Sequence, residues 1–261
     1  MKTANLFIVF VLLLGITASS CKDKKDDEIT PEDSFDKSGM LTNIGNNIIV
    51  SSYLNLNISL DSLQVRSSQF TANPTLITLS ELQSQFSLAY SAYQSCSAFE
   101  FGPAENEYIR SNFNTFPCDT LQINSKITTA EYTLSAATDI DAKGFPGLDF
   151  LLYGNSMNNN QVLARFTSAA DAANAKLYLT AVVNELKAKT NIVYNGWSSA
   201  GGNYISTFKS NTANDVGGSI SMLVNQLNYD MELLKNAKVG IPLGKKTLGV
   251  PQPSKVEALY S

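Results

Sequence analysis

Histidine is absent from the sequence, which has 261 residues. Without an imidazole, no serine or cysteine nucleophile can have a histidine base, and the histidine-based zinc motif of metalloproteases is excluded. A metal site in this chain would therefore use carboxylates, tyrosines, amides, carbonyls or thiolates. Oxygen ligands of this kind suit hard cations, including ferric iron.

Charge is also scarce, since charged residues make up 16% of the chain and the formal net charge is −4. The chain has no basic excess that would mark a nucleic-acid-binding protein, so no nucleic-acid partner is predicted. It also lacks a sustained period-two strand pattern and a credible short repeat. Its length allows one sizeable domain or two small ones.

The N-terminus has the features of a targeting segment. Lys2 precedes the apolar run 6–16, which is too short to span a membrane comfortably. Residues 18–21, Ala-Ser-Ser-Cys, resemble a relaxed bacterial lipobox. We therefore expect residues 1–20 to be a lipoprotein signal peptide and Cys21 to be the lipidated N-terminus, anchored to the outer membrane on its periplasmic or surface face. The alternative is an ordinary signal peptide.

A charged stretch follows the cysteine. Residues 22–28 read Lys-Asp-Lys-Lys-Asp-Asp-Glu, which cannot bury apolar area. We interpret residues 21–34 as a flexible charged tether, although the run also resembles the export signal of some Bacteroidetes lipoproteins. The folded domain is predicted to span residues 35–261.

Helical periodicity dominates that domain. The first helix is predicted from Asp36 to about Ser68, with the chain turning at Asn73-Pro74. Thr78 and Glu81 have capping-box spacing, so a second helix is expected from there to about Phe99, antiparallel to the first.

Further helices are expected after the aromatic-rich stretch 104–117, which is predicted to hold a short helix and loops. A second capping-box pattern, 128–131, predicts a short helix toward residue 137. Residues 161 to about 189 predict one long helix with an apolar stripe at Phe166, Ala170, Ala173, Leu177 and Ala181. The last long helix is capped by Asn214 or Asp215 and carries Val216, Ile220, Leu223, Leu227, Met231 and Leu234. Residues 254–261 resemble the start of another helix.

The segment from Gly144 to Gly154, Gly-Phe-Pro-Gly-Leu-Asp-Phe-Leu-Leu-Tyr-Gly, is the most distinctive part of the chain. Its leucines recur at helical spacing, so a short helix with one buried face is predicted. Pro146 is tolerated in a first helical turn. Asp149 is the only charged residue of the segment, and it is either a solvated or capping carboxylate or a functional one.

This segment resembles the signature of the imelysin family, in which a G-x-H-x-x-E pattern precedes an aromatic-Leu-Leu-aromatic-Gly tail. Gly144 and the tail match, whereas Pro146 replaces the family histidine and Asp149 replaces the family glutamate. Two further stretches resemble the same family: 93–103, Tyr-Gln-Ser-Cys-Ser-Ala-Phe-Glu-Phe-Gly-Pro, and 238–249, Lys-Val-Gly-Ile-Pro-Leu-Gly-Lys-Lys-Thr-Leu-Gly.

The resemblance implies an all-α, up-and-down helical bundle: the first bundle of the family plus the opening of a second, incomplete at the C-terminus. It also implies a role in iron uptake, with a peptidase activity described for the founding member. We therefore expect a non-catalytic envelope lipoprotein that binds iron or haem, with an outer-membrane uptake partner. The alternatives are an interaction lipoprotein without a small-molecule site and a peptidase, for which the chain offers no histidine.

Candidate site residues cluster around two segments. Asp149 is the leading metal ligand, and Glu100 or Glu105 would join it if the 93–103 turn lay nearby; otherwise these acids are solvated helix-terminal groups. Cys96 and Cys118 form a disulfide or remain separate buried thiols. The aromatic residues near this turn line a pocket for a flat ligand such as haem or, the favoured alternative, pack in the core. These are Tyr90, Tyr93, Phe99, Phe101, Tyr108, Phe113 and Phe116.

Overall fold

The computed structural model describes residues 35–261, so the predictions for residues 1–20, residues 21–34 and Cys21 lie outside the described residues. Residues 37–261 form one contact unit. Within this part of the chain every regular element is helical and no strand occurs, which confirms the all-α prediction.

The helices of the structure have the following bounds. They are α2 (Lys37–Asn43), the π-helix η2 (Ile44–Val50), α3 (Ser51–Ala72), α4 (Leu76–Gln94), α5 (Pro103–Asn106), α6 (Ile109–Asn114), α7 (Thr120–Thr128), the 3-10 helix η3 (Ala137–Asp139), α8 (Gly144–Tyr153), α9 (Asn159–Thr167), α10 (Ala172–Trp197), α11 (Tyr204–Ser210), α12 (Ser219–Leu233), the π-helix η4 (Leu234–Lys238) and the 3-10 helix η5 (Pro253–Lys255).

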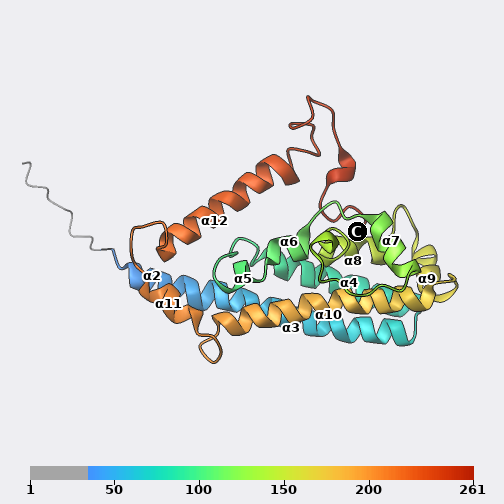
Figure 1. The fold of residues 1–261 in the computed structure, drawn as a ribbon, viewed down its shortest axis with the longest axis horizontal. Helices are drawn as coiled ribbons and strands as arrows, with labels where there is room; N and C mark the ends of the chain where they lie inside the picture. The colour runs from blue at the N-terminus through green and yellow to red at the C-terminus, as the bar shows by residue number, and fades with distance from the viewer. Residues whose placement is uncertain (1–34) are drawn as a thin grey trace, which may run out of the picture. The chain divides into compact units, whose positions relative to one another are not determined.

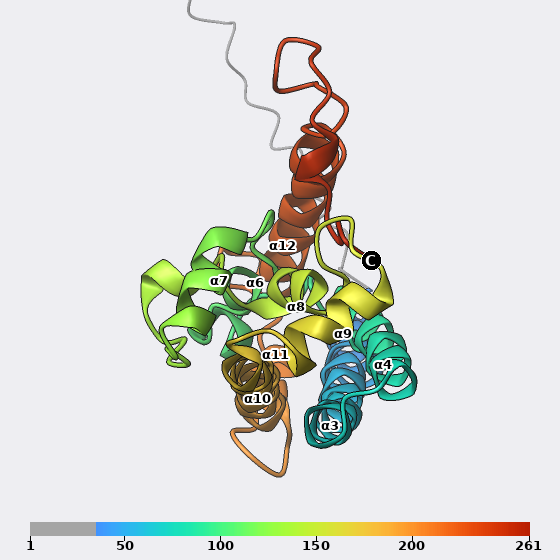
Figure 2. The same cartoon turned by 90° about the vertical axis from the view of Figure 1, so that its right-hand side faces the viewer.

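Three long helices, α3, α4 and α10, build the bundle (Figure 1). The helices α3 and α4 are antiparallel neighbours, and α10 packs along the other side of α3. Leu56, Leu60 and Leu63 lie on one face of α3, because they are three and four residues apart, and all three are fully buried. Figure 2 looks along these helices and shows α8 above α10, so the signature helix covers the open side of the bundle.

The first predicted helix is confirmed: α2, η2 and α3 continue without a break, and Asn73 ends the run. The start of the second helix is one turn earlier than predicted. Thr75 and Thr78 form the capping box, because the helix begins directly after Pro74. Glu81 instead pairs with Arg66 at 2.9 Å, and α4 ends at Gln94.

The helix predicted to start at residues 128–131 is wrong. The Asp119 carboxylate accepts the N–H groups of Leu121 and Gln122, so α7 begins at Thr120 and ends at Thr128. Ala130 then has a positive φ of 58°, and the Glu131 carboxylate pairs with Lys126 instead of capping a helix.

The single helix predicted from residue 161 to 189 is two helices, α9 and α10, separated by residues 168–171. The break changes the phase of the apolar stripe, so Leu177 is 52% exposed while Tyr178, Leu179 and Val182 are buried. Trp197 is the last residue of α10 and is fully buried.

The last long helix exists but is mostly exposed. Gly218 precedes α12 at its N-terminus in place of Asn214 or Asp215, and Val216 is 85% exposed. Of the predicted stripe, Leu223 alone is buried. The chain then returns to the bundle without the helix predicted over 254–261, since only η5 is helical there.

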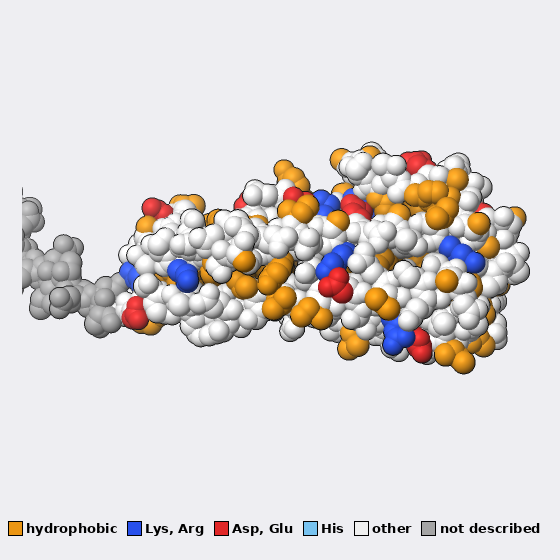
Figure 3. Space-filling model, turned by 90° about the horizontal axis from the view of Figure 1, so that it is seen from below, with side chains coloured by type: hydrophobic (Ala, Val, Ile, Leu, Met, Phe, Trp, Pro, Cys, Tyr) orange, Lys and Arg blue, Asp and Glu red, His pale blue; other side chains and the backbone are white. Residues whose placement is uncertain are grey.

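No helix of the described chain is both long and apolar enough to span a membrane. The face seen in Figure 3, where α3 and α10 lie, carries few charges, and its exposed apolar side chains are dispersed among uncharged polar ones. Scattered apolar residues of this kind are normal for a protein surface.

Candidate functional site

Glycines fix both ends of the signature helix α8. Gly144 has a φ of +70°, and a Cβ there would lie 2.5 Å from the carbonyl oxygen of Phe113. Gly154, with a φ of +69°, ends the helix as its N–H donates to the carbonyl of Phe150. Pro146 falls in the first turn, where its missing N–H costs no helical hydrogen bond. Gly144 and Pro146 thus position the helix, and neither has a side-chain atom that could bind a metal.

Asp149 is 1% exposed, so the solvated alternative is wrong. Its Oδ2 accepts the backbone N–H of Tyr260 at 2.8 Å. Its Oδ1 is buried and makes no hydrogen bond. Burial raises the pKa of the Asp149 carboxyl, and the interactions with the Tyr260 N–H and with the hydroxyl and N–H of Ser261 only partly oppose the rise.

Glu257, in the same C-terminal segment as Tyr260, is the functional candidate that the sequence did not reveal. Its Oε1 accepts hydrogen bonds from Tyr90 Oη at 2.7 Å, Gln94 Nε2 at 2.8 Å and Asn114 Nδ2. Its Oε2 lies 3.0 Å from Lys238 Nζ. Burial alone would raise the pKa of Glu257, but the hydrogen bonds from Asn114 and Tyr90 and the charge of Lys238 outweigh it, so this pKa lies below its usual value.

Glu257 is therefore an ionised carboxylate at neutral pH, held by side chains from α4, α6 and η4. Nothing in its local sequence signals this role, because its donors are between 19 and 167 residues away along the chain. A shallow groove of about 350 Å³ lies beside it, lined by Phe86, Ser87, Tyr90, Ser91, Gln94, Glu257, Ala258 and Ser261. We call this the Glu257 groove.

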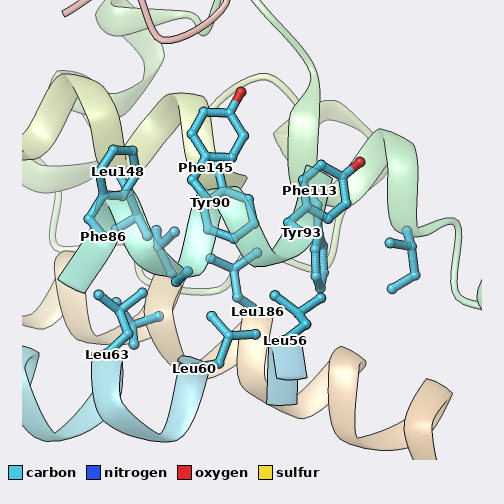
Figure 4. Close-up of a cluster of buried hydrophobic side chains, with 14 of the residues drawn as sticks. Leu56, Leu60, Leu63, Phe86, Tyr90, Tyr93, Phe113, Phe145, Leu148 and Leu186 are labelled. Atoms are coloured by element: carbon cyan, nitrogen blue, oxygen red, sulfur yellow. The ribbon is translucent and has the colours of Figure 1, made fainter. Parts of the chain in front are cut away.

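An aromatic cluster supports the signature helix from below (Figure 4). The Phe145 ring stacks on Tyr90 at 4.8 Å and on Tyr93 at 5.3 Å, and it meets Phe113 edge-on at 6.1 Å. Phe113 and Phe145 are fully buried, and Tyr93 nearly so. These rings fill the core, so the core-packing alternative is right for them; Tyr90 also presents its hydroxyl to Glu257.

The predicted cluster of Asp149 with Glu100 or Glu105 is not formed. The Glu100 carboxylate is held by Arg110, with an ion pair of 3.2 Å and a hydrogen bond of 3.0 Å from the Arg110 N–H. Glu105 is exposed in the first turn of α5. Across residues 35–261, no group of three or more histidine, cysteine, aspartate or glutamate side chains is arranged to hold a metal ion.

Cys96 and Cys118 are free and buried, so the disulfide alternative is wrong for this structure. The Cys96 thiol lies 3.3 Å from the carbonyl of Tyr93. Burial, and then the nearby charge of Asp149, raise the pKa of Cys118 to about 12, so it is a neutral thiol beside the signature carboxylate.

Three segments that are distant in sequence thus meet at α8. Tyr93 and Gln94 come from the stretch 93–103, Lys238 opens the stretch 238–249, and both stretches are tied to the C-terminal segment through Glu257. The sequence model of the imelysin family, described as "Imelysin", matches residues 49–261. The chain belongs to the imelysin family. None of the curated proteins compared matches this imelysin.

Two solved structures share the fold. One is an iron-regulated protein A precursor of Parabacteroides distasonis, with a TM-score of 0.69 and 17% identity, covering 86% of this chain and 68% of its own. The other is an imelysin-like protein of Psychrobacter arcticum, with a TM-score of 0.65 and 19% identity, covering 80% of this chain and 63% of its own. The chain therefore spans about two thirds of the length of each.

Proposed function

We propose that this imelysin is a non-catalytic lipoprotein of the bacterial cell envelope that binds iron or haem for uptake. The observation that carries the proposal is the buried, unpaired Oδ1 of Asp149 in the signature helix. A buried acceptor left without a donor costs about 1–3 kcal/mol, so it calls for an explanation, and a bound ligand is one.

The chemistry around Asp149 suits such a cargo. A carboxylate oxygen is a hard ligand and favours ferric iron. One free oxygen can serve as a single ligand to iron whose other positions are already filled, as they are in haem or in a chelate. The ionised Glu257 and the Tyr90 hydroxyl lie at the adjoining Glu257 groove and add oxygen atoms that can orient the cargo.

The relatives point in the same direction. The solved structure from Parabacteroides distasonis is named as an iron-regulated protein, which supports a link between this fold and iron supply. For the same reason we propose an outer-membrane uptake component as the partner, and Cys21 as the lipid anchor that keeps the chain beside it.

A structural role without a small-molecule site is the second candidate. It is favoured by Pro146 at the histidine position and by the Tyr260 N–H, which covers Oδ2 of Asp149. We do not propose a peptidase, because neither Pro146 nor any other residue of the signature can supply an imidazole base.

The two candidate functions predict different effects of Asp149→Asn on ligand binding. Ferric chelate and haem would be titrated into the purified chain and into the Asp149→Asn variant, with Glu105→Gln as a control that removes an exposed carboxylate. The binding proposal expects a loss of at least about tenfold in affinity for Asp149→Asn, equivalent to about 1.4 kcal/mol, and none for the control. No binding by the well-folded wild-type chain would favour the structural role, and equal affinities for all three proteins would show that Asp149 is not a ligand.

A further inference from the structure

A second cavity, which we call the α6–α10 cavity, lies apart from the Glu257 groove and shares no lining residue with it. Its volume is about 470 Å³, which falls in the range of small-molecule sites. Its walls come from the start of α6, the loop before α8, and α10. The lining residues are Tyr108, Ser111, Asn112, Ser135, Ala136, Ala137, Ile140, Lys143, Glu185 and Lys189.

The inner end of this cavity holds a buried ammonium. Lys143 has a side chain only 2% exposed, and its Nζ donates to the Leu134 carbonyl at 2.6 Å and to Glu185 Oε1 at 2.7 Å. An ammonium has three donors, so one is left over. A lysine this buried is rare unless it is paired, and its only charged partner among residues 35–261, Glu185, also lines the cavity.

A second charged pair lies one helical turn further along α10. Lys189 follows Glu185 by four residues, so the two side chains project from the same face about 5–6 Å apart at Cβ. The Lys189 Nζ contacts Glu107 Oε2 at 3.0 Å and the Glu107 carbonyl at 3.4 Å, which again leaves one donor unused. The ion pair of Glu185 with Lys143 is made by its Oε1 atom.

The charges around the cavity balance, with two ammonium groups against the carboxylates of Glu185 and Glu107. A ligand with a net charge would leave one charge uncompensated in this half-buried place. A dipolar ligand would not, because its carboxylate can accept from Lys189 while its ammonium donates to Glu185. Ala136, Ala137 and Ile140 form an apolar part of the remaining wall, and Ser111, Asn112 and Ser135 add polar groups.

Tyr108 adds a ring at the cavity in an unusual backbone conformation. Its φ is +49°, in the left-handed region that non-glycine residues seldom occupy. The Asn112 side-chain amide holds it there by donating to the carbonyls of Glu107 and Tyr108 at 3.0 and 3.1 Å. Strained residues that the surroundings hold in place are concentrated at binding sites.

We propose that the α6–α10 cavity binds a zwitterionic α-amino acid with an apolar side chain. The amino acid's carboxylate lies at Lys189, its ammonium at Glu185, and its side chain against the alanines, Ile140 and the Tyr108 ring. The site is independent of the iron proposal, since it uses none of the residues around Asp149.

In the test, L-leucine is titrated into the whole chain. Binding is monitored through the amide signals of residues 185 and 189 in NMR spectra. N-acetyl-leucine, leucinamide and N-acetyl-leucinamide are matched probes that lack the ammonium, the carboxylate or both. We expect saturable shifts with leucine at a Kd of about 1 mM or tighter, and at least tenfold weaker binding of each derivative. No saturable shift with leucine, or equal binding of N-acetyl-leucine, would overturn the proposal.

Two variants test where the ligand binds. Lys189→Met should weaken leucine binding at least tenfold, whereas Lys187→Met, on the same helix but paired with Asp61 at 2.6 Å, should leave it unchanged. Ala137→Phe, at an exposed position, should block the cavity with the fold intact by circular dichroism. Unchanged binding in both Lys189→Met and Ala137→Phe would contradict the assignment.

Discussion

At the scale of single residues, the signature segment works through its glycines and one carboxylate. Helical spacing predicts that Asp149 lies on a short helix, and the structure confirms that helix. Its environment cannot be predicted from the local sequence, because the group that donates to Oδ2 is the N–H of Tyr260, 111 residues later. The replacement of the family histidine by Pro146 changes the chemistry of the signature and leaves its backbone intact.

Gly144→Ala should destabilise the protein by about 2 kcal/mol or more, because a positive φ disfavours alanine and its Cβ would clash with the Phe113 carbonyl. Gly217→Ala is the matched control, since its nearest neighbouring atom would lie at 3.5 Å and its φ is not positive. Urea denaturation of the two variants measures the difference. Similar midpoints for both would show that Gly144 is not sterically required.

Asp149 should make stability depend on pH. Its pKa is raised in the folded chain, so the folded state holds this proton more tightly than the unfolded state. The free energy of unfolding should therefore fall as pH rises from about 4 through the folded pKa. In Asp149→Asn this contribution is absent, so the wild type should gain stability relative to the variant as the pH falls from 7 to about 4. Denaturation curves at several pH values that run parallel for the two proteins would contradict this.

At the scale of elements, the sequence predicts the long helices and the end at Asn73-Pro74 correctly, but it does not predict a break within a helical stretch. Asn73-Pro74 ends α3 as expected, and the apolar period of 36–68 predicts its helix. The break at residues 168–171 was not predicted, since it contains no proline or glycine and alanines continue through it. Likewise, Thr128 and Glu131 have capping-box spacing, but α7 starts earlier, with Asp119 as its N-cap. The two possible helix starts can be distinguished only from the tertiary packing that buries Ile123 and Ile127.

The C-terminal segment is held by Glu257, so Glu257→Gln should release it locally. The variant loses charge-assisted hydrogen bonds worth about 1.5–3 kcal/mol in total, and amide exchange at residues 256–261 should speed up at least tenfold while the helices α3 and α10 keep their protection. Glu232→Gln, on the exposed part of α12, is the control.

The same segment should also respond to acid. The pKa of Glu257 is lowered in the folded chain, so its contribution is present above the unfolded value, near 4.5, and is lost as pH falls through the folded pKa. Unchanged exchange of residues 256–261 in Glu257→Gln at neutral pH would show that Glu257 does not anchor the segment.

At the scale of the whole molecule, the all-α bundle and the family could be predicted from sequence. Of the candidate site, Asp149 could be predicted and Glu257 could not. The three stretches that resemble the family converge on α8, but they do so through Glu257, which lies in none of them. Glu100 was a candidate partner of Asp149 in sequence, yet its carboxylate is paired with Arg110. The matched part of this chain covers about two thirds of each similar structure, so the activity of a whole imelysin is a proposal for this chain.

The proposed envelope location depends on Cys21, which lies outside the described residues. In bacteria grown with a radiolabelled fatty acid, the wild-type chain should incorporate label and sediment with membranes. Cys21→Ser should lose both properties, whereas Cys96→Ser, at a buried thiol, should retain the label. Equal labelling of wild type and Cys21→Ser would contradict a lipid anchor at this residue.

The most direct test of the central claim is the stoichiometry of iron and haem binding to the folded wild-type chain. Elemental analysis of the purified protein would come first, followed by equilibrium titration with haem and with a ferric chelate. The proposal predicts saturation near one equivalent of one of these ligands, with a spectral or calorimetric signal that Asp149→Asn weakens. A well-folded chain that binds neither ligand would contradict the proposal that this imelysin captures iron or haem.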